Sequence, residues 1–100
     1  MLIRAAGPGL AALNVAKAMT DPALALYRGA TLLAENDDWS RSRNSAAVAA
    51  TASRAGAFAF ADGSLDAALL VTLAPGAYTA VVTGVAESSG LALVEVYDVN

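Results

Sequence analysis

Apolar residues alternate with polar or small ones in several short segments of this chain, a pattern typical of half-buried β-strands. The first segment, Leu2–Ala6, ends at the Gly-Pro-Gly of residues 7–9. A second begins at an Asp-Pro turn and ends at Gly29, and Thr31–Glu35 is expected to return antiparallel to it. The short apolar run Phe58–Phe60 predicts a further strand.

The C-terminal third of the sequence predicts a meander of antiparallel strands. The runs AALLVTL and AYTAVVTGV flank an Ala-Pro-Gly turn at residues 74–76, and Leu91–Val99 follows a Glu-Ser-Ser-Gly turn. Within the middle strand, alternation places Tyr78, Ala80 and Val82 on one face. The hairpin around Ala-Pro-Gly is therefore expected to form the centre of a sheet.

Two segments favour helix over strand. Residues 10–15 fit one short helical turn, and Ser45–Ala55 is a run of good helix formers. Asn44 or Ser45 would cap its N-terminus and Gly56 would end it. About six or seven short strands with one or two short helices predict an all-β fold, an antiparallel β-sandwich or jelly-roll-like domain. Residues 1–100 are too few for a second core, so we expect a single domain.

Composition narrows the surroundings in which such a domain could work. Hydrophobic residues make up 57% of the chain, and many of them are alanines, which form shallow side-chain layers. Charged residues or glycine interrupt each apolar run before the roughly 18 residues of a membrane helix, so we predict no membrane span. The surplus apolar surface is more naturally shared with another protein chain than with lipid.

Charge and residue types exclude several function classes. The net charge is −3 and the arginines are scattered, which disfavours nucleic acid. The chain has no cysteine for thiol chemistry and no histidine to act as a base near neutral pH. Adjacent Asp37 and Asp38 would diverge on an extended backbone. We therefore predict no enzyme activity and no cofactor other than a structural ion.

The densest group of oxygen ligands is Asn36-Asp37-Asp38. Calcium takes carboxylate and carbonyl oxygens from irregular loops, so this cluster predicts a structural calcium site. The alternative is a turn whose side chains bond their own backbone. The neighbouring Trp39 likewise has two interpretations, a platform for a bound sugar or an aromatic that closes the rim of the sandwich.

The N-terminal strand has two interpretations as well. Leu2–Ala6 could fold back as an ordinary first strand, or it could extend from a hinge at residues 7–9 and insert into the neighbouring copy. In the second case every copy has one donor and one acceptor, so the contact is head-to-tail and produces a filament. The C-terminal strand Leu91–Val99 would border the acceptor. The predicted interface comprises Leu2, Ile3, Arg4, Ala5, Leu91, Leu93, Val94 and Val96.

Five quoted segments together carry a resemblance: LIRAAGPGLAAL, DPALALYRG, NDDW, AALLVTLAPGAYTAVVTGV and GLALVEVYDV. The chain resembles a domain of large secreted and cell-surface proteins of environmental bacteria, and it is distantly similar to pre-peptidase C-terminal domains. The resemblance implies a small extracellular β-sandwich without catalysis, sometimes with bound calcium. It matches Asn36, Asp37 and Asp38 to the acidic loop, and it matches Pro75, Gly76 and Tyr78 to the turn before a central strand.

The sequence thus favours a structural subunit of an extracellular bacterial filament, at the cell surface or beyond it, whose partner is another copy of the chain. The alternative is a calcium-stabilised accessory or binding domain of a secreted protein, with carbohydrate among its candidate ligands. The residues after Met1 lack a basic segment and a long apolar segment, so we expect no signal peptide. The chain is then either a cytosolic protein or a mature or excised domain, and the resemblance favours the second.

Overall fold

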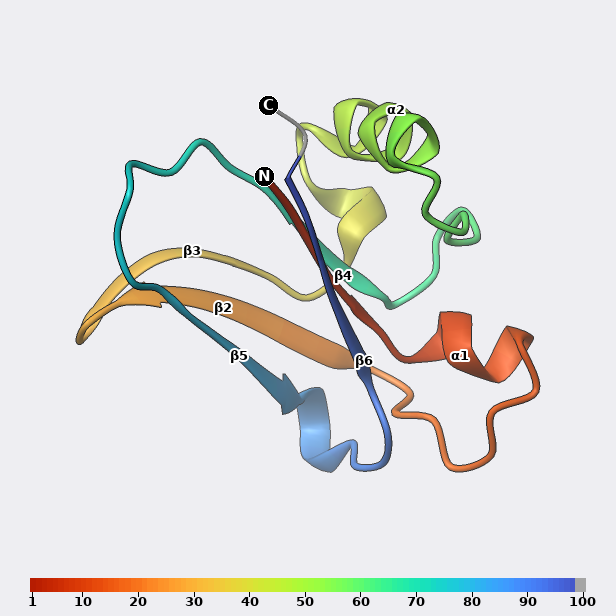
Figure 1. The fold of residues 1–100 in the computed structure, drawn as a ribbon. Coiled ribbons are helices and arrows are strands. Elements are labelled where there is room, and N and C mark those ends of the chain that lie inside the picture. The colour runs from red at the N-terminus through yellow and green to blue at the C-terminus, as the bar shows by residue number, and fades with distance from the viewer. Residues whose placement is uncertain (99–100) are drawn as a thin grey trace.

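A computed structural model describes residues 1–98 and places them in two antiparallel sheets that pack into a small sandwich (Figure 1). One sheet has the order β4-β1-β6 and the other has the order β3-β2-β5. The predicted all-β sandwich is therefore confirmed. The strands are β1 (Leu2–Ala6), β2 (Pro22–Arg28), β3 (Thr31–Asn36), β4 (Ala67–Leu70), β5 (Thr79–Gly84) and β6 (Leu93–Tyr97). The helices are α1 (Pro8–Ala12) and α2 (Ser45–Ala55), with single 3₁₀ turns at Trp39–Arg41 and Val85–Glu87.

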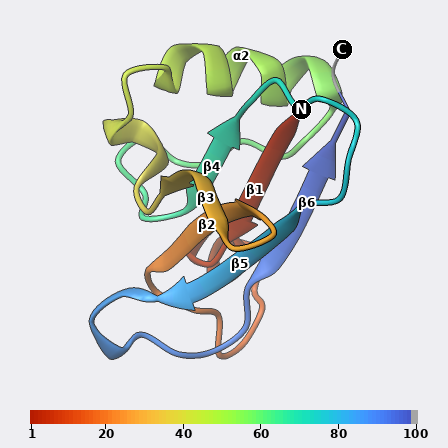
Figure 2. The same cartoon turned by 90° about the vertical axis from the view of Figure 1, so that its left-hand side faces the viewer.

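Strand β1 is the central strand of its sheet, between β4 and β6 (Figure 2). All five of its residues are buried. It runs antiparallel to both neighbours, with Ile3 opposite Leu69 on one side and opposite Val96 on the other. The N-terminal amino group donates a hydrogen bond of 2.8 Å to the carbonyl of Val71. The first strand thus folds back into its own chain in this structure.

The two faces of β1 serve two different cores. Ile3 and Ala5 face the second sheet, and Leu2 faces the side that α2 covers. The inter-sheet core consists of Ile3, Ala5, Leu24, Leu26, Ala67 and Leu69. The core under α2 consists of Leu2, Trp39, Val48, Ala52 and Ala68. Among residues 1–98 no helix is long and apolar enough to cross a membrane.

The predicted C-terminal meander is wrong. β4 and β5 lie in different sheets, and residues 71–78 cross from one sheet to the other (Figure 1). The hydroxyl of Tyr78 bonds the carbonyl of Ala74, so the Pro-Gly turn shapes this crossing and not a hairpin. Alternation identified the faces correctly, since Val82 packs on the inter-sheet core. It carries no information about which strand is the partner, and β5 pairs with β2.

The predicted strand at Phe58–Phe60 is also wrong, because these residues form an irregular segment that wraps around Arg4. The other local predictions are closer to the structure. Helix α2 follows Asn44 and ends at Gly56, whose φ of 78° is left-handed as a glycine stop requires. The first helix begins at Pro8, earlier than the predicted residue 10.

Replacing Leu26 with alanine tests the inter-sheet core. Leu26 is 2% exposed, so we expect its truncation to lower the free energy of unfolding by about 3 kcal/mol. Leu32, on the neighbouring strand, is 45% exposed, and Leu32→Ala should cost about 0.5 kcal/mol or less. Urea denaturation of both variants measures the difference. Equal losses would contradict the core described above.

Candidate functional site

The predicted interface residues of β1 and β6 lie side by side within one chain. Ile3 pairs with Val96, and Ala5 pairs with Val94. The predicted donor strand, β1, is therefore paired with β6, which is part of the predicted border of the acceptor. Leu91 lies before β6 and forms an isolated bridge with Ala18. The last residue of the predicted strand, Val99, lies outside the described residues.

The inter-sheet layer remains open along β6. Val94 and Val96 share the face of Ile3 and Ala5, yet they are 45% and 59% exposed. Ala80 of β5 pairs with the buried Leu26 and is exposed too. We call Ala80, Val94 and Val96 the open side of the sandwich. On this side the described residues leave core-facing apolar atoms in contact with solvent.

Arg4 occupies a position in β1 where an apolar residue would be usual. Its side chain is 1% exposed. Nε donates to Oε1 of Glu95 at 3.0 Å, and Nη1 donates to the carbonyl of Phe58 at 2.7 Å. The guanidinium also stacks on Phe60, 3.8 Å from the ring centroid. A buried charge requires such partners, so Arg4 fixes β6 and the segment around Phe58 on the same face of the sheet.

Glu95 has a second partner on its own strand. The hydroxyl of Tyr97 donates a hydrogen bond to Oε2 of Glu95. This bond, followed by burial, raises the pKa of Tyr97 above its usual value. The three side chains Arg4, Glu95 and Tyr97 therefore form a polar cluster that joins β1 to β6. Sequence analysis missed it, although an arginine within LIRAA and a glutamate within LVEVY were the available signals.

The predicted hinge at residues 7–9 is held by a buried carboxylate that the sequence analysis did not single out for this role. Asp66 is 0% exposed, and its Oδ1 accepts the amides of Gly7 and Gly9 at 2.8 and 2.9 Å. Its Oδ2 accepts the hydroxyl of Ser64 at 2.7 Å. A Cβ at Gly7 would lie 2.2 Å from the carbonyl oxygen of Met19, which explains the glycine. Any movement of β1 out of the sheet requires the release of Asp66.

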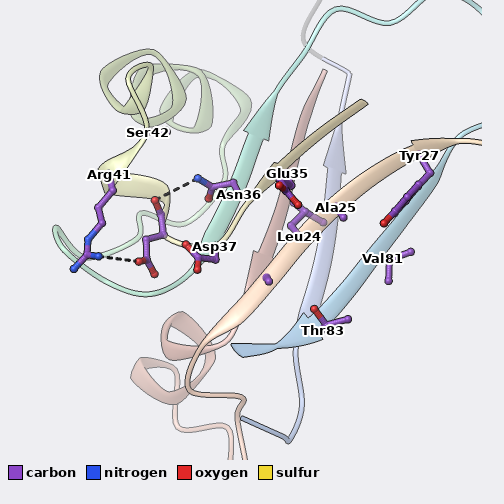
Figure 3. A pocket seen from close by; sticks show the side chains of 12 residues that line it. Leu24, Ala25, Tyr27, Glu35, Asn36, Asp37, Arg41, Ser42, Val81 and Thr83 are labelled. Atoms are coloured by element: carbon purple, nitrogen blue, oxygen red, sulfur yellow. Dashed lines mark hydrogen bonds and ion pairs between the residues drawn. The ribbon is translucent and has the colours of Figure 1, made fainter. Parts of the chain in front are cut away.

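The acidic loop forms much of its structure with protein partners. Asn36 accepts the amide of Ala68 at 3.0 Å through Oδ1 and donates to the carbonyl of Asp38 at 3.3 Å through Nδ2. Oδ2 of Asp38 lies 3.5 Å from Nη1 of Arg41 (Figure 3). The side-chain carboxamide of Asn36 thus links β3 to β4 through backbone groups. This is the structural role expected if the loop is a turn whose side chains bond the backbone.

The same loop borders a cavity of about 620 Å³ on the outer face of the second sheet (Figure 3). Glu35, Asp37 and Asp38 line it together with Arg41 and Tyr27, and we call it the acidic groove. Oδ1 of Asp38 is buried and accepts no hydrogen bond from any residue that the structure describes, and the same holds for Oδ1 of Asp21, which does not line the groove.

The charges of the loop act on Asp21. Burial, then the negative charges of Asp38 and Asp37, raise the pKa of Asp21, while Arg41 lowers it. Within residues 1–98, however, no group of three or more histidine, cysteine, aspartate or glutamate side chains is arranged to hold a metal ion. The calcium site at Asn36, Asp37 and Asp38 stays a prediction.

Trp39 belongs to the core, which corrects its interpretation as a sugar platform. It is 6% exposed. Its indole Nε1 donates to the hydroxyl of Ser64 at 3.1 Å, and its ring lies 6.3 Å from that of Phe60. An aromatic ring that stacks on a sugar must present a face to solvent, and Trp39 does not. The aromatic residue that lines the acidic groove is Tyr27.

No protein-family model, curated protein or solved structure matches the chain. The resemblance to pre-peptidase C-terminal domains therefore rests on the quoted sequence segments alone.

Asp21→Asn tests the electrostatics of the acidic loop. The pKa of Asp21 in the folded protein is raised above its usual 3.8. Ionisation of Asp21 therefore lowers the stability of the fold, and this loss develops as the pH rises from 3.8 through the folded-state pKa. The neutral amide removes this effect. We expect Asp21→Asn to raise the thermal midpoint at pH 7 and to change it less at pH 3. Exposed Asp62→Asn is the matched control, and equal midpoints for the two variants at pH 7 would refute the account.

Proposed function

We propose that the chain is a structural subunit whose copies join head-to-tail by exchanging β1, in an extracellular bacterial filament. The observation that carries the proposal is the place of β1. It is a short N-terminal strand that supplies the centre of a sheet, with all five residues buried between β4 and β6. Its hydrogen bonds and packing would be the same whichever copy supplied it.

The chain around β1 suits such an exchange. Residues 7–9 contain two glycines and directly follow the strand, so they can change backbone direction at low steric cost. The contacts of Asp66 with Gly7 and Gly9 favour the folded-back form. Intramolecular and intermolecular insertion of β1 bury the same residues. A high local concentration of chains therefore shifts the balance toward insertion into a neighbouring copy.

The open side gives a neighbouring copy additional surface to cover. Val94 and Val96 are exposed on a core-facing side, and β6 is an edge strand without proline or lysine. Its one charged residue, Glu95, is paired with Arg4. Edge strands are usually protected by charge or proline, so an edge like this one favours association. The extracellular location is supported by the sequence resemblance alone.

Two single-cysteine variants test the exchange, since the natural chain has no cysteine. Met1 and Val71 exchange both backbone hydrogen bonds, so the adjacent pair Leu2 and Leu70 is of the close, non-hydrogen-bonded type. Its Cα separation of about 4.5 Å is within the range of a disulfide. Leu2→Cys and Leu70→Cys chains are unfolded together, refolded at high concentration and oxidised. We expect a disulfide-linked dimer on a non-reducing gel.

The control replaces Leu2→Cys with Leu33→Cys, whose side chain is 45% exposed and lies in the other sheet. This mixture should yield no more than background dimer. A chain that carries both Leu2→Cys and Leu70→Cys reports the folded-back form through an intramolecular bond. If the double variant is oxidised but the mixed single variants stay monomeric, β1 does not exchange and the filament proposal fails.

A second candidate function is a calcium-stabilised binding module, which the acidic groove favours. The observation behind it is that Oδ1 of Asp21 and Oδ1 of Asp38 are both buried and accept no hydrogen bond within the described part of the chain. A bound cation would balance the negative charges of both carboxylates and would also weaken their repulsion by Asp37. The groove beside them is large enough for a polar ligand, and Tyr27 provides an aromatic wall.

Calcium binding is tested by thermal unfolding. If the loop binds with a Kd near 1 mM, as extracellular modules do, about 10 mM calcium should add about 1.4 kcal/mol of stability. Asp38→Asn should abolish that gain, whereas Asp62→Asn should retain it. An unchanged midpoint in calcium, or the same gain in magnesium, would exclude a specific calcium site.

A further inference from the structure

The outer side of β6 is a sheet edge whose hydrogen-bonding residues can be identified. No strand within residues 1–98 pairs with that side (Figure 2). In an antiparallel sheet, successive residues of a central strand point their amide and carbonyl groups alternately to one neighbouring strand and to the other. Met1 points its groups to β4, since it exchanges both backbone bonds with Val71. The alternation therefore points the backbone groups of Arg4 toward β6.

The same alternation assigns the outward groups of β6 to Val94 and Val96. Arg4 is opposite Glu95, so Glu95 directs its amide and carbonyl toward β1, and the residues on either side of it direct theirs outward. The side chains of Val94 and Val96 are 45% and 59% exposed on the inter-sheet face. Outward backbone groups and exposed apolar side chains thus belong to the same two residues. An edge of this kind is a template for a further strand.

We propose that the outer edge of β6 pairs with β6 of a second copy, antiparallel and across a two-fold axis. When the two strands are centred on Glu95, all five residues of Leu93–Tyr97 overlap. Val94 of each copy is then opposite Val96 of the other, so these residues exchange backbone hydrogen bonds and their side chains form one apolar cluster. The nearest registers that also match outward groups are shifted by two residues, which removes two of the five residues of β6 from the pairing.

The charges of two such edges are compatible. Glu95 of one copy lies opposite Glu95 of the other, and like charges in that arrangement destabilise a sheet. Both oxygens of this carboxylate have partners, because Oε1 lies 2.9 Å from Nη2 of Arg4 and Oε2 accepts the hydroxyl of Tyr97. The two copies therefore meet through two balanced ion pairs. The contact is the same patch on both copies, so it closes after two of them.

This pairing is separate from the exchange of β1. Strand β1 lies on the inner side of β6 and would occupy that place whichever copy supplied it. Two five-residue strands form a small interface, so a single pairing is weak and depends on concentration. If the proposed filament exists, the same edge would join two filaments side by side, and that consequence alone rests on the proposed function.

Two single-cysteine variants, Val94→Cys and Val96→Cys, test the register, since the natural chain has no cysteine. The folded chains, one of them ¹⁵N-labelled, are mixed without denaturant at high concentration and oxidised. In the proposed register the two positions form a hydrogen-bonded pair with a Cα separation of about 5.5 Å, which a disulfide can span. We expect mass spectrometry to find more mixed dimer than random pairing produces. Exchange of β1 does not bring these positions together.

Val81 provides the matched control, because it is 38% exposed on β5, an edge strand of the other sheet. A mixture of Val81→Cys and Val96→Cys should give no excess of mixed dimer. Sedimentation of the cysteine-free chain should show a dimer that grows with concentration. Val96→Lys should raise its dissociation constant at least about tenfold, since lysine protects a strand edge, and Val81→Lys should leave it unchanged.

Three results would each overturn the proposal. They are a chain that stays monomeric at high concentration, mixed disulfides at the random level, and a dimer that is insensitive to Val96→Lys. In the first case, an apolar strand of a different protein becomes the occupant to test at this edge. A failure of the β1 exchange experiment would not affect these measurements, because they use folded chains that keep their own β1.

Discussion

The burial of the Arg4 guanidinium is the constraint on which the rest of the structure depends. A charge that is 1% exposed is stable only with close partners. Those partners come from distant parts of the chain, with Glu95 on β6 and Phe58 and Phe60 after α2. Satisfying one side chain thus fixes the register of β1 against β6. It also positions the irregular segment at Phe58–Phe60.

The same arrangement makes β1 both essential and separable. Its residues join two cores, yet it is tied to the remaining chain through a short glycine-containing segment that Asp66 holds. The partners of Arg4 lie on other elements, so a β1 from a neighbouring copy would find them in the same places. The open side at Val94 and Val96 adds apolar surface that residues 1–98 of one copy leave exposed.

Sequence patterns predicted the elements better than their partners. Alternation and glycine stops located β1, β2, β3 and α2, because those signals are local. The Ala-Pro-Gly hairpin was wrong because a turn sequence fits a crossing between sheets as well as a tight connection. Phe58–Phe60 was misassigned since its rings pack around Arg4, a long-range contact. Arg4 and Asp66 were visible as charges in or beside strands, but their partners could be known only from the fold.

Electron cryomicroscopy of the full chain at high concentration tests the central claim most directly. The decisive density is that of residues 7–9, which shows whether β1 enters the sheet of its own copy or that of the next one. The account predicts fibres in which each β1 lies between β4 and β6 of the neighbouring subunit. Monomers alone, or fibres in which every β1 stays in its own sheet, would contradict it.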